Sequence, residues 1–164
     1  MSNKIETLRD VLIDELMDLY SAEQQLVKAL PKMAEAASSE DLKEGFTEHL
    51  SQTEGHVERL ERVFELLDVP AKAKKCKAME GLIAEGEEKV EEDASPSTKD
   101  AALICAAQKV EHYEIAGYGT VRTFADVLGY TEVAELLQET LDEEADTDKT
   151  LTAIASSINA EAKP

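Results

Sequence analysis

Apolar residues recur at steps of three and four along most of this 164-residue chain, and this spacing constrains the fold more than any other feature. Such steps gather apolar side chains on one face of an α-helix. The pattern predicts long helices over residues 4–37, 41–67, 99–128 and 131–159, and a shorter amphipathic helix over 78–92. No stretch shows the alternation of a β-strand. We therefore expect an all-α protein.

The order of these helices predicts how they pack. Short connections within the first and last pairs of long helices make each pair antiparallel, while the long connection 71–98 carries the chain back along the bundle. This is the connectivity of the ferritin-like four-helix bundle, here with an extra short helix in the crossover. We expect residues 1–164 to form a single ferritin-like domain. Pro31 predicts a kink or break near Leu30, and Ser95-Pro96-Ser97 is expected to form a loop.

The charge balance excludes some classes of partner. Asp and Glu number 36 against 17 Lys and Arg, giving a formal net charge of −19. This charge disfavours nucleic acid and anionic membrane surfaces as partners. No apolar run approaches the roughly 18 residues that a membrane span requires, and no signal-peptide pattern opens the chain. We therefore expect a cytoplasmic protein without nucleic-acid or membrane partners.

The two cysteines form neither a CxxC motif nor a metal-binding spacing. Cys105 lies in an apolar run and is expected to be a small buried core residue. Cys76 lies in a lysine-rich connection, where the neighbouring charges have the sign that lowers a thiol pKa. A redox role for Cys76 is the less favoured interpretation.

Acidic and histidine side chains occupy the apolar stripes near the middle of each long helix. Carboxylates are almost never fully buried unless they are paired or bound to metal. The carboxylates on the stripes are Glu23, Glu111, Glu114, Glu144 and Asp148, and the second long helix carries His49 and His56. Antiparallel helices of similar length align their midpoints, so these groups are expected to meet in one slab of the core.

Several carboxylates and one or two imidazoles can neutralise two divalent ions held about 4 Å apart. Oxygen-rich ligation with histidine suits iron or manganese better than zinc. We predict a dinuclear site of iron, manganese or both, with the ligands Glu23, His56, Glu111, Glu114, Glu144 and Asp148. The sequence leaves open whether His49, Glu15 or Glu54 is also a ligand.

Other interpretations of the inward carboxylates remain open at this stage. They can share protons or pair with basic side chains. They can also point away from the core if a helix is rotated about its axis relative to the expected orientation. Arg59, Arg62 and Lys109 all fall on the outer faces of their helices, so few basic partners are expected inside.

Five segments carry the pattern of a known family, and together they span almost the whole chain. They are Asp14–Leu26, Ala29–Met33, His49–Glu61, Cys76–Ile83 and Val110–Ala116. In these segments the chain resembles the YciF-type family of ferritin-like stress proteins. The resemblance implies a ferritin-like bundle that forms a homodimer and serves a stress response.

The wider ferritin-like superfamily offers a second, weaker comparison. There, two helices each give a Glu and the other two each give Glu-x-x-His. Glu23, Glu111, His56 and Glu144 match this pattern, with Thr53 and Thr147 standing where a Glu and a His are expected. These departures put standard ferroxidase or manganese catalase chemistry in doubt, and Glu114 and Asp148 are the candidates to compensate.

The leading functional hypothesis is a non-haem di-iron or iron–manganese protein that acts on peroxide or dioxygen during stress. Tyr20 or Tyr118 would relay a proton or an electron. The alternative is a non-catalytic helical stress or scaffold protein with a vestigial metal site.

Overall fold

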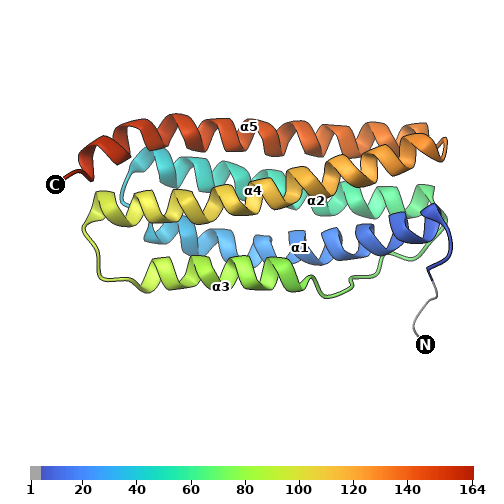
Figure 1. The fold of residues 1–164 in the computed structure, drawn as a ribbon, viewed down its shortest axis with the longest axis horizontal. Coiled ribbons are helices and arrows are strands. Elements are labelled where there is room, and N and C mark those ends of the chain that lie inside the picture. The colour runs from blue at the N-terminus through green and yellow to red at the C-terminus, as the bar shows by residue number, and fades with distance from the viewer. Residues whose placement is uncertain (1–4) are drawn as a thin grey trace.

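A computed structural model describes residues 5–164, which form five helices and no strand (Figure 1). The helices are α1 (Leu8–Ala36), α2 (Glu40–Leu66), α3 (Lys77–Glu91), α4 (Pro96–Val127) and α5 (Thr131–Glu161). The predicted all-helical class is confirmed. The predicted first residue of the first helix, Lys4, lies outside the described residues.

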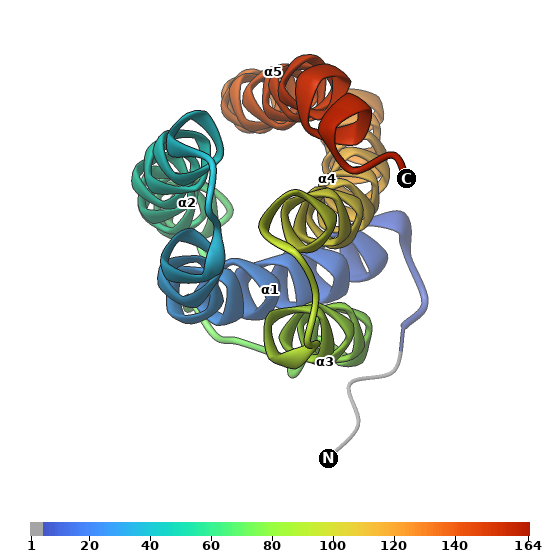
Figure 2. The same cartoon turned by 90° about the vertical axis from the view of Figure 1, so that its left-hand side faces the viewer.

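The four long helices lie side by side, and the short helix packs on the outside of them. Viewed from one end, α1, α2, α5 and α4 surround a common centre (Figure 2). Helix α3 contacts α1 and α4 and lies beside one half of their length (Figure 1). The long connection thus places its helix on one face of the bundle.

Local capping chemistry fixes where the helices begin. Thr7 and Asp10 form a capping box at the start of α1, and Ser39 caps α2 through its side chain. Pro96 occupies the first turn of α4, where its missing N–H costs no hydrogen bond. The expectation that residues 95–97 form a loop is therefore wrong, because only Ser95 stays outside the helix as its N-cap.

A kink or a break was expected near Leu30, and the first helix continues through Pro31 without a break. Proline removes one backbone hydrogen bond inside a helix. The apolar stripe nevertheless runs past this point, because Leu30 before the proline is buried and Met33 and Ala34 after it pack against the same apolar cluster. Packing of this stripe outweighs the local cost of the proline.

Two apolar clusters fill the bundle, one toward each end. The first contains Leu16, Leu60, Val121 and Leu137, and the second contains Leu26, Phe46, Leu103 and Leu151. Each cluster draws residues from α1, α2, α4 and α5. The middle turns of these four helices lie between the two clusters, and they carry the buried polar residues described below.

Helices α1 and α4 approach each other closely at Gly117. A Cβ atom at this position would lie 2.9 Å from Cδ2 of Leu19. Gly117 lies directly before the buried Tyr118, so the close approach occurs beside the polar middle of the bundle. A side chain at this position would require the buried Leu19 side chain to shift.

Across residues 5–164, no helix is both long enough and apolar enough to cross a membrane.

Candidate metal centre

Six buried acidic and histidine side chains meet between the two apolar clusters. They form one group of His49, Glu111, Glu114 and Glu144, and a second group of Glu23, His56 and Glu144. Within each group, the atoms able to bind a metal lie within 4.8 Å of one another. None of the six residues is more than 3% exposed. Glu144 belongs to both groups and connects them.

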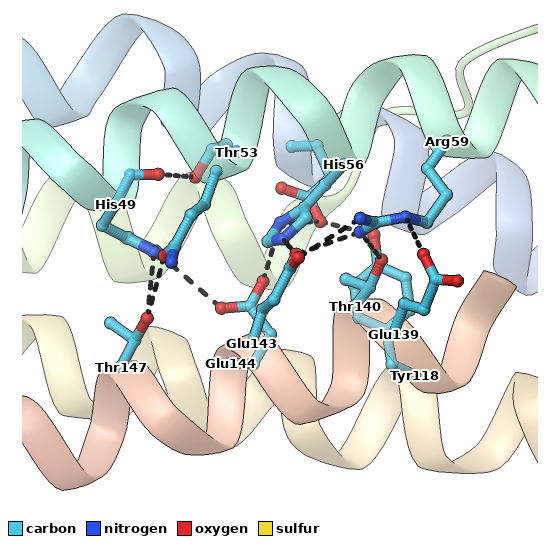
Figure 3. Close-up of polar contacts among 12 residues, drawn as sticks. His49, Thr53, His56, Arg59, Tyr118, Glu139, Thr140, Glu143, Glu144 and Thr147 are labelled. Atoms are coloured by element: carbon cyan, nitrogen blue, oxygen red, sulfur yellow. Dashed lines mark hydrogen bonds and ion pairs between the residues drawn. The ribbon is translucent and has the colours of Figure 1, made fainter.

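All four long helices contribute to these groups, but they contribute unequally. The carboxylates come from α1, α4 and α5, whereas both histidines come from α2. His49 and His56 are seven residues apart, which is about two helical turns, so both rings project from the same face of α2. Figure 3 shows both rings pointing toward α5, which carries Glu144.

Distances between the rings and the carboxylates define the two halves of the cluster. Nε2 of His49 lies 3.1 Å from Oε1 of Glu111 and 3.9 Å from Oε2 of Glu144. Nδ1 of His56 lies 3.0 Å from Oε1 of Glu144 and 3.5 Å from Oε1 of Glu23. The two oxygens of Glu144 therefore face different histidines.

The outward nitrogen of His56 meets a second, partly exposed carboxylate. Nε2 of His56 lies 2.7 Å from Oε2 of Glu143, and the Arg59 guanidinium donates to both oxygens of Glu143 at 3.0 and 3.2 Å (Figure 3). Arg59 also donates to Thr140 at 2.8 Å. The expectation that Arg59 belongs to the outer face is wrong, because its side chain is only 19% exposed. It curls along α2 toward α5 (Figure 3).

The two ring nitrogens of His49 also face different partners, although the outer partner, Thr147, is more distant. Its Nδ1 lies 3.4 Å from the Thr147 hydroxyl, while its Nε2 faces the carboxylates. Thr53 donates to the backbone carbonyl of His49 at 2.7 Å, so its hydroxyl serves its own helix. Metal-binding imidazoles are typically held by a second partner in this manner.

Tyr118 extends the second group by one hydrogen bond. Its buried hydroxyl donates to Oε1 of Glu23. Burial, together with the charges of Glu23 and Glu114, holds the pKa of Tyr118 well above its usual value, so the hydroxyl keeps its proton. Tyr20 instead donates to Glu61 at 2.7 Å. Of the two tyrosines considered from the sequence, Tyr118 is therefore the one that contacts the cluster.

The cluster contains an unusual concentration of buried polar atoms that make no hydrogen bond, although the two inward histidine nitrogens lie within ion-pair distance of carboxylates. Such atoms are rare in proteins because each carries a desolvation cost. Among the described residues, these atoms are Oε2 of Glu23, Nε2 of His49, Nδ1 of His56, Oε2 of Glu111, and both carboxylate oxygens of Glu114 and of Glu144. Each is a metal-ligand type of atom, so the six residues fit a bound cation.

In the absence of a cation, protons must compensate the crowded charges. Burial raises the pKa of Glu23, raises that of Glu111 to about 8, and raises that of Glu114 well above its usual value. Burial opposes protonation of the histidines, but the nearby carboxylates outweigh it and raise the pKa of His49 to about 9 and of His56 to about 10. The same ion pairs overcome burial at Glu144 and lower its pKa to about 2.

The structure does not bring all the predicted ligands together. Asp148 lies apart from the two groups, where it accepts a hydrogen bond from Gln108 at 3.1 Å and lies 3.3 Å from Nε2 of His112. Four residues on an α-helix amount to 400°, so Asp148 is turned about 40° from Glu144 and faces α4. Glu15 and Glu54, which the sequence left open, are exposed.

Both cysteines differ from their expected environments. Cys76 is buried, with its sulfur 3.1 Å from the Tyr113 hydroxyl, and burial raises its thiol pKa instead of lowering it. Cys105 is exposed, since it lies on the outward face of α4 between the buried residues Ile104 and Ala106. The apolar run around Cys105 therefore belongs to an Ala-rich helix that is buried on one face and exposed on the other.

Comparison with known proteins agrees with the family resemblance. A family model described as a domain of unknown function, DUF892, matches residues 7–163. The chain is 50% identical to the protein YciF of Escherichia coli over 161 residues, which cover 97% of each chain.

Solved structures give the same result. The crystal structure of the E. coli stress protein YciF matches with a TM-score of 0.93 at 49% identity, covering 97% of this chain and 100% of that chain. YcfI of Rhodopseudomonas palustris matches with a TM-score of 0.89 at 43% identity, covering 93% and 97%. A Xanthomonas campestris protein with a TM-score of 0.73 is 22% identical, covers 94% of each chain, and shares the fold. The chain therefore belongs to the YciF family of stress proteins, which carries the DUF892 domain.

Proposed function

We propose that this protein is a ferritin-like stress protein whose bundle holds a dinuclear centre of iron, manganese or both, and that the centre reacts with peroxide or dioxygen. One observation carries the proposal. Buried and unpartnered nitrogen and oxygen atoms of six side chains converge in two groups that share Glu144. A pair of divalent cations would satisfy all of these atoms at once.

The donor set supports two ions. Ferritin-like di-metal proteins use four carboxylates and two histidines, drawn as two single Glu and two Glu-x-x-His motifs. The cluster here also contains four carboxylates and two histidines, but Glu114 of α4 and His49 of α2 make up for the Thr53 and Thr147 positions. Four carboxylate charges balance two divalent cations.

Each residue has a distinct part in this proposal. His49, Glu111 and Glu114 would hold one ion, Glu23 and His56 would hold the other, and Glu144 would bind both. The bound ions would supply the electrons and the polarising charge for reaction with an oxidant. Tyr118 keeps a proton at its hydroxyl against Glu23, and Arg59 fixes Glu143 against His56. An apolar cluster lies on either side of the centre.

Metal analysis combined with an oxidant assay tests the proposal. We expect two ions of iron or manganese per chain in the wild type, and consumption of hydrogen peroxide or dioxygen by the loaded protein. Glu144→Gln should lose most of both ions, because it removes the shared charge. Glu135→Gln is the matched control, since Glu135 is an exposed carboxylate on the same helix. Full occupancy in Glu144→Gln would show that the ligands lie elsewhere.

The alternative is a non-catalytic role, and one comparison favours it: YcfI of R. palustris has been proposed to be a structural protein. In that case the cations would stabilise the bundle without turnover. A wild-type protein that binds two ions but consumes neither oxidant would assign this role.

A further inference from the structure

A mainly apolar cavity of about 300 Å³ adjoins one half of the candidate metal centre. All five helices contribute to its wall. Most of its lining is apolar, with Leu30, Phe46, Val110 and Leu151 among the buried residues. At its inner end, the cavity reaches His49 and Glu111, which belong to the first group of candidate ligands.

We propose that this cavity binds a small, neutral, largely apolar organic molecule whose polar end lies toward His49 and Glu111. The further step, that this molecule is a substrate of the metal centre, rests on the proposed function. Known ligand pockets have volumes of about 300 Å³ and more, are mainly apolar, and carry a few convergent polar groups. The cavity has this composition, because Gln52 and Thr147 line it together with His49 and Glu111.

The deep burial of the polar residues that line the cavity argues for a small molecule as the occupant. His49 is 3% exposed and Glu111 is 1% exposed, yet both line the cavity. A helix or loop of another protein is too wide to pass between packed helices and reach these side chains. A slender molecule can reach them.

Charge argues against an anionic occupant, and burying any charged group in a mainly apolar cavity carries a desolvation cost. The exposed acidic residues Glu48, Glu87 and Asp146 line the cavity. Lys32 pairs with Glu87 at 2.9 Å and Lys149 pairs with Asp146 at 2.8 Å, so these charges largely cancel. Glu48 and the net charge of −19 remain, and they repel anions such as carboxylates.

Binding of 1-octanol and octanoate to the metal-free protein tests the proposal by calorimetry. We expect saturable binding of 1-octanol and at least tenfold weaker binding of octanoate. Gly86→Leu should weaken 1-octanol binding at least tenfold, because Gly86 is a buried lining residue of α3. A Cβ atom there meets only ordinary contacts, at 3.8 Å from Met33 and 3.9 Å from Ala106, so the larger side chain extends into the cavity. Gly81→Leu is the matched control on the same helix, since Gly81 is exposed with no atom near its Cβ position.

A second measurement decides the question even if Gly86→Leu folds poorly. Nuclear Overhauser contacts should connect octanol methylene protons with the His49 ring in the wild-type protein. The proposal is overturned if these contacts are absent. It is also overturned if octanol binding to the wild type does not saturate, if octanoate binds as tightly as octanol, or if folded Gly86→Leu binds octanol with the wild-type affinity. It is also overturned if Gly86→Leu converts a dimer to a monomer, because a second copy of the chain would then be the occupant.

These outcomes are separable from those of the metal proposal, because the binding tests need no metal. Octanol binding in a wild-type protein that takes up no iron or manganese would retain the cavity site and reject the metal centre. Normal metal content without octanol binding would retain the metal centre and reject the cavity site.

Discussion

His49 and His56 each point one ring nitrogen at the carboxylate cluster and hold the other against a second partner. For His56 that partner is Glu143, which is itself held by the guanidinium fork of Arg59. An imidazole ring that is held by contacts at both nitrogens has one orientation, and each nitrogen has a fixed hydrogen-bonding role. The polar residues around the cluster therefore matter for metal affinity as well as the ligands themselves.

We predict that Arg59→Met weakens metal binding without unfolding the protein. The substitution frees Glu143, so the His56 ring loses its fixed orientation, and loss of such a partner typically costs 10- to 100-fold in affinity. Manganese titration followed by electron paramagnetic resonance measures the change. Arg62→Met is the control, because Arg62 is half-exposed on the same helix and pairs with Glu65 and Glu132. Equal affinities in the two variants would contradict this role of Arg59.

We also predict that the metal-free protein loses stability as the pH rises from about 5 to 9. In the folded state the pKa of Glu111 is raised to about 8, that of His49 to about 9 and that of His56 to about 10. The folded protein therefore holds more protons than the unfolded chain in this window, so stability falls with increasing pH. The lowered pKa of Glu144, about 2, acts in the opposite direction but only below its unfolded value of 4.5.

Thermal unfolding of chelator-treated protein at pH 6 and pH 9 checks this prediction. Metal-loaded protein is the control and should show a much smaller decrease in Tm, because its ligands are already deprotonated. A Tm of the metal-free protein that rises between these two pH values would show that the cluster does not hold protons in this way.

The sequence predicts which residue types are buried together more reliably than it predicts their exact directions. Glu23, His56, Glu111, Glu114 and Glu144 lie on apolar stripes near helix midpoints, so their meeting could be predicted from periodicity alone. Asp148 lies outside the two groups because a turn of 40° is small on a helical wheel but large enough to change the facing helix. The sequence does not decide whether His49 is a ligand, because the superfamily pattern has only one histidine on this helix.

At the scale of whole elements, the separation of α1 and α4 controls one edge of the site. Gly117 of α4 lies against Leu19 of α1, and the next residue, Tyr118, donates its hydroxyl to Glu23 of α1. The absence of a side chain at Gly117 leaves room for the buried Leu19 side chain beside this hydrogen bond.

We predict opposite effects on stability from alanine at two neighbouring glycines of α4. Gly117→Ala should lower the free energy of unfolding by about 1 kcal/mol, because crowding against the buried Leu19 outweighs the gain in helix propensity. Gly119→Ala should raise it by about 0.5–1 kcal/mol, since its Cβ would meet only Leu141 at 4.0 Å. Urea unfolding of both variants measures the two changes. A stabilising Gly117→Ala would indicate that the helices can separate without cost.

Helix bodies could be predicted from the sequence, whereas some of their ends could not. The stripes of all five helices are visible as three- and four-residue steps, because burial of one face leaves that signature. The start of α4 was misjudged because Ser95-Pro96-Ser97 has the composition of a loop, yet proline is well suited to a first helical turn. A break at Pro31 does not occur, because the core contacts of Leu30, Met33 and Ala34 on both sides of it are not visible in the local sequence.

At the scale of the whole molecule, the chain is a bundle with apolar ends and a polar middle. Some large apolar side chains remain outside both clusters: Ile5 is 50% exposed and Val127 is 70% exposed. A surface pocket lined by Ile13, Met17 and Val69 adds further apolar area. A contact surface would cover such groups if they form one continuous patch.

We predict that the protein forms a homodimer in solution, as the family resemblance also implies. Light scattering coupled to size exclusion should give twice the monomer mass at micromolar concentration. Val127→Lys should shift the population toward monomer, because it replaces a large exposed apolar side chain with a charged one. A wild-type protein that elutes as a monomer at this concentration would contradict the prediction.

The shared position of Glu144 has a consequence for how a metal centre here would fill. One oxygen of this carboxylate faces His56 and the other faces His49. The first ion to arrive would immobilise the side chain in the orientation that the second ion requires, so the second would bind with a smaller loss of conformational entropy. Filling would therefore be cooperative, and at limiting metal the population would divide into empty and doubly loaded molecules.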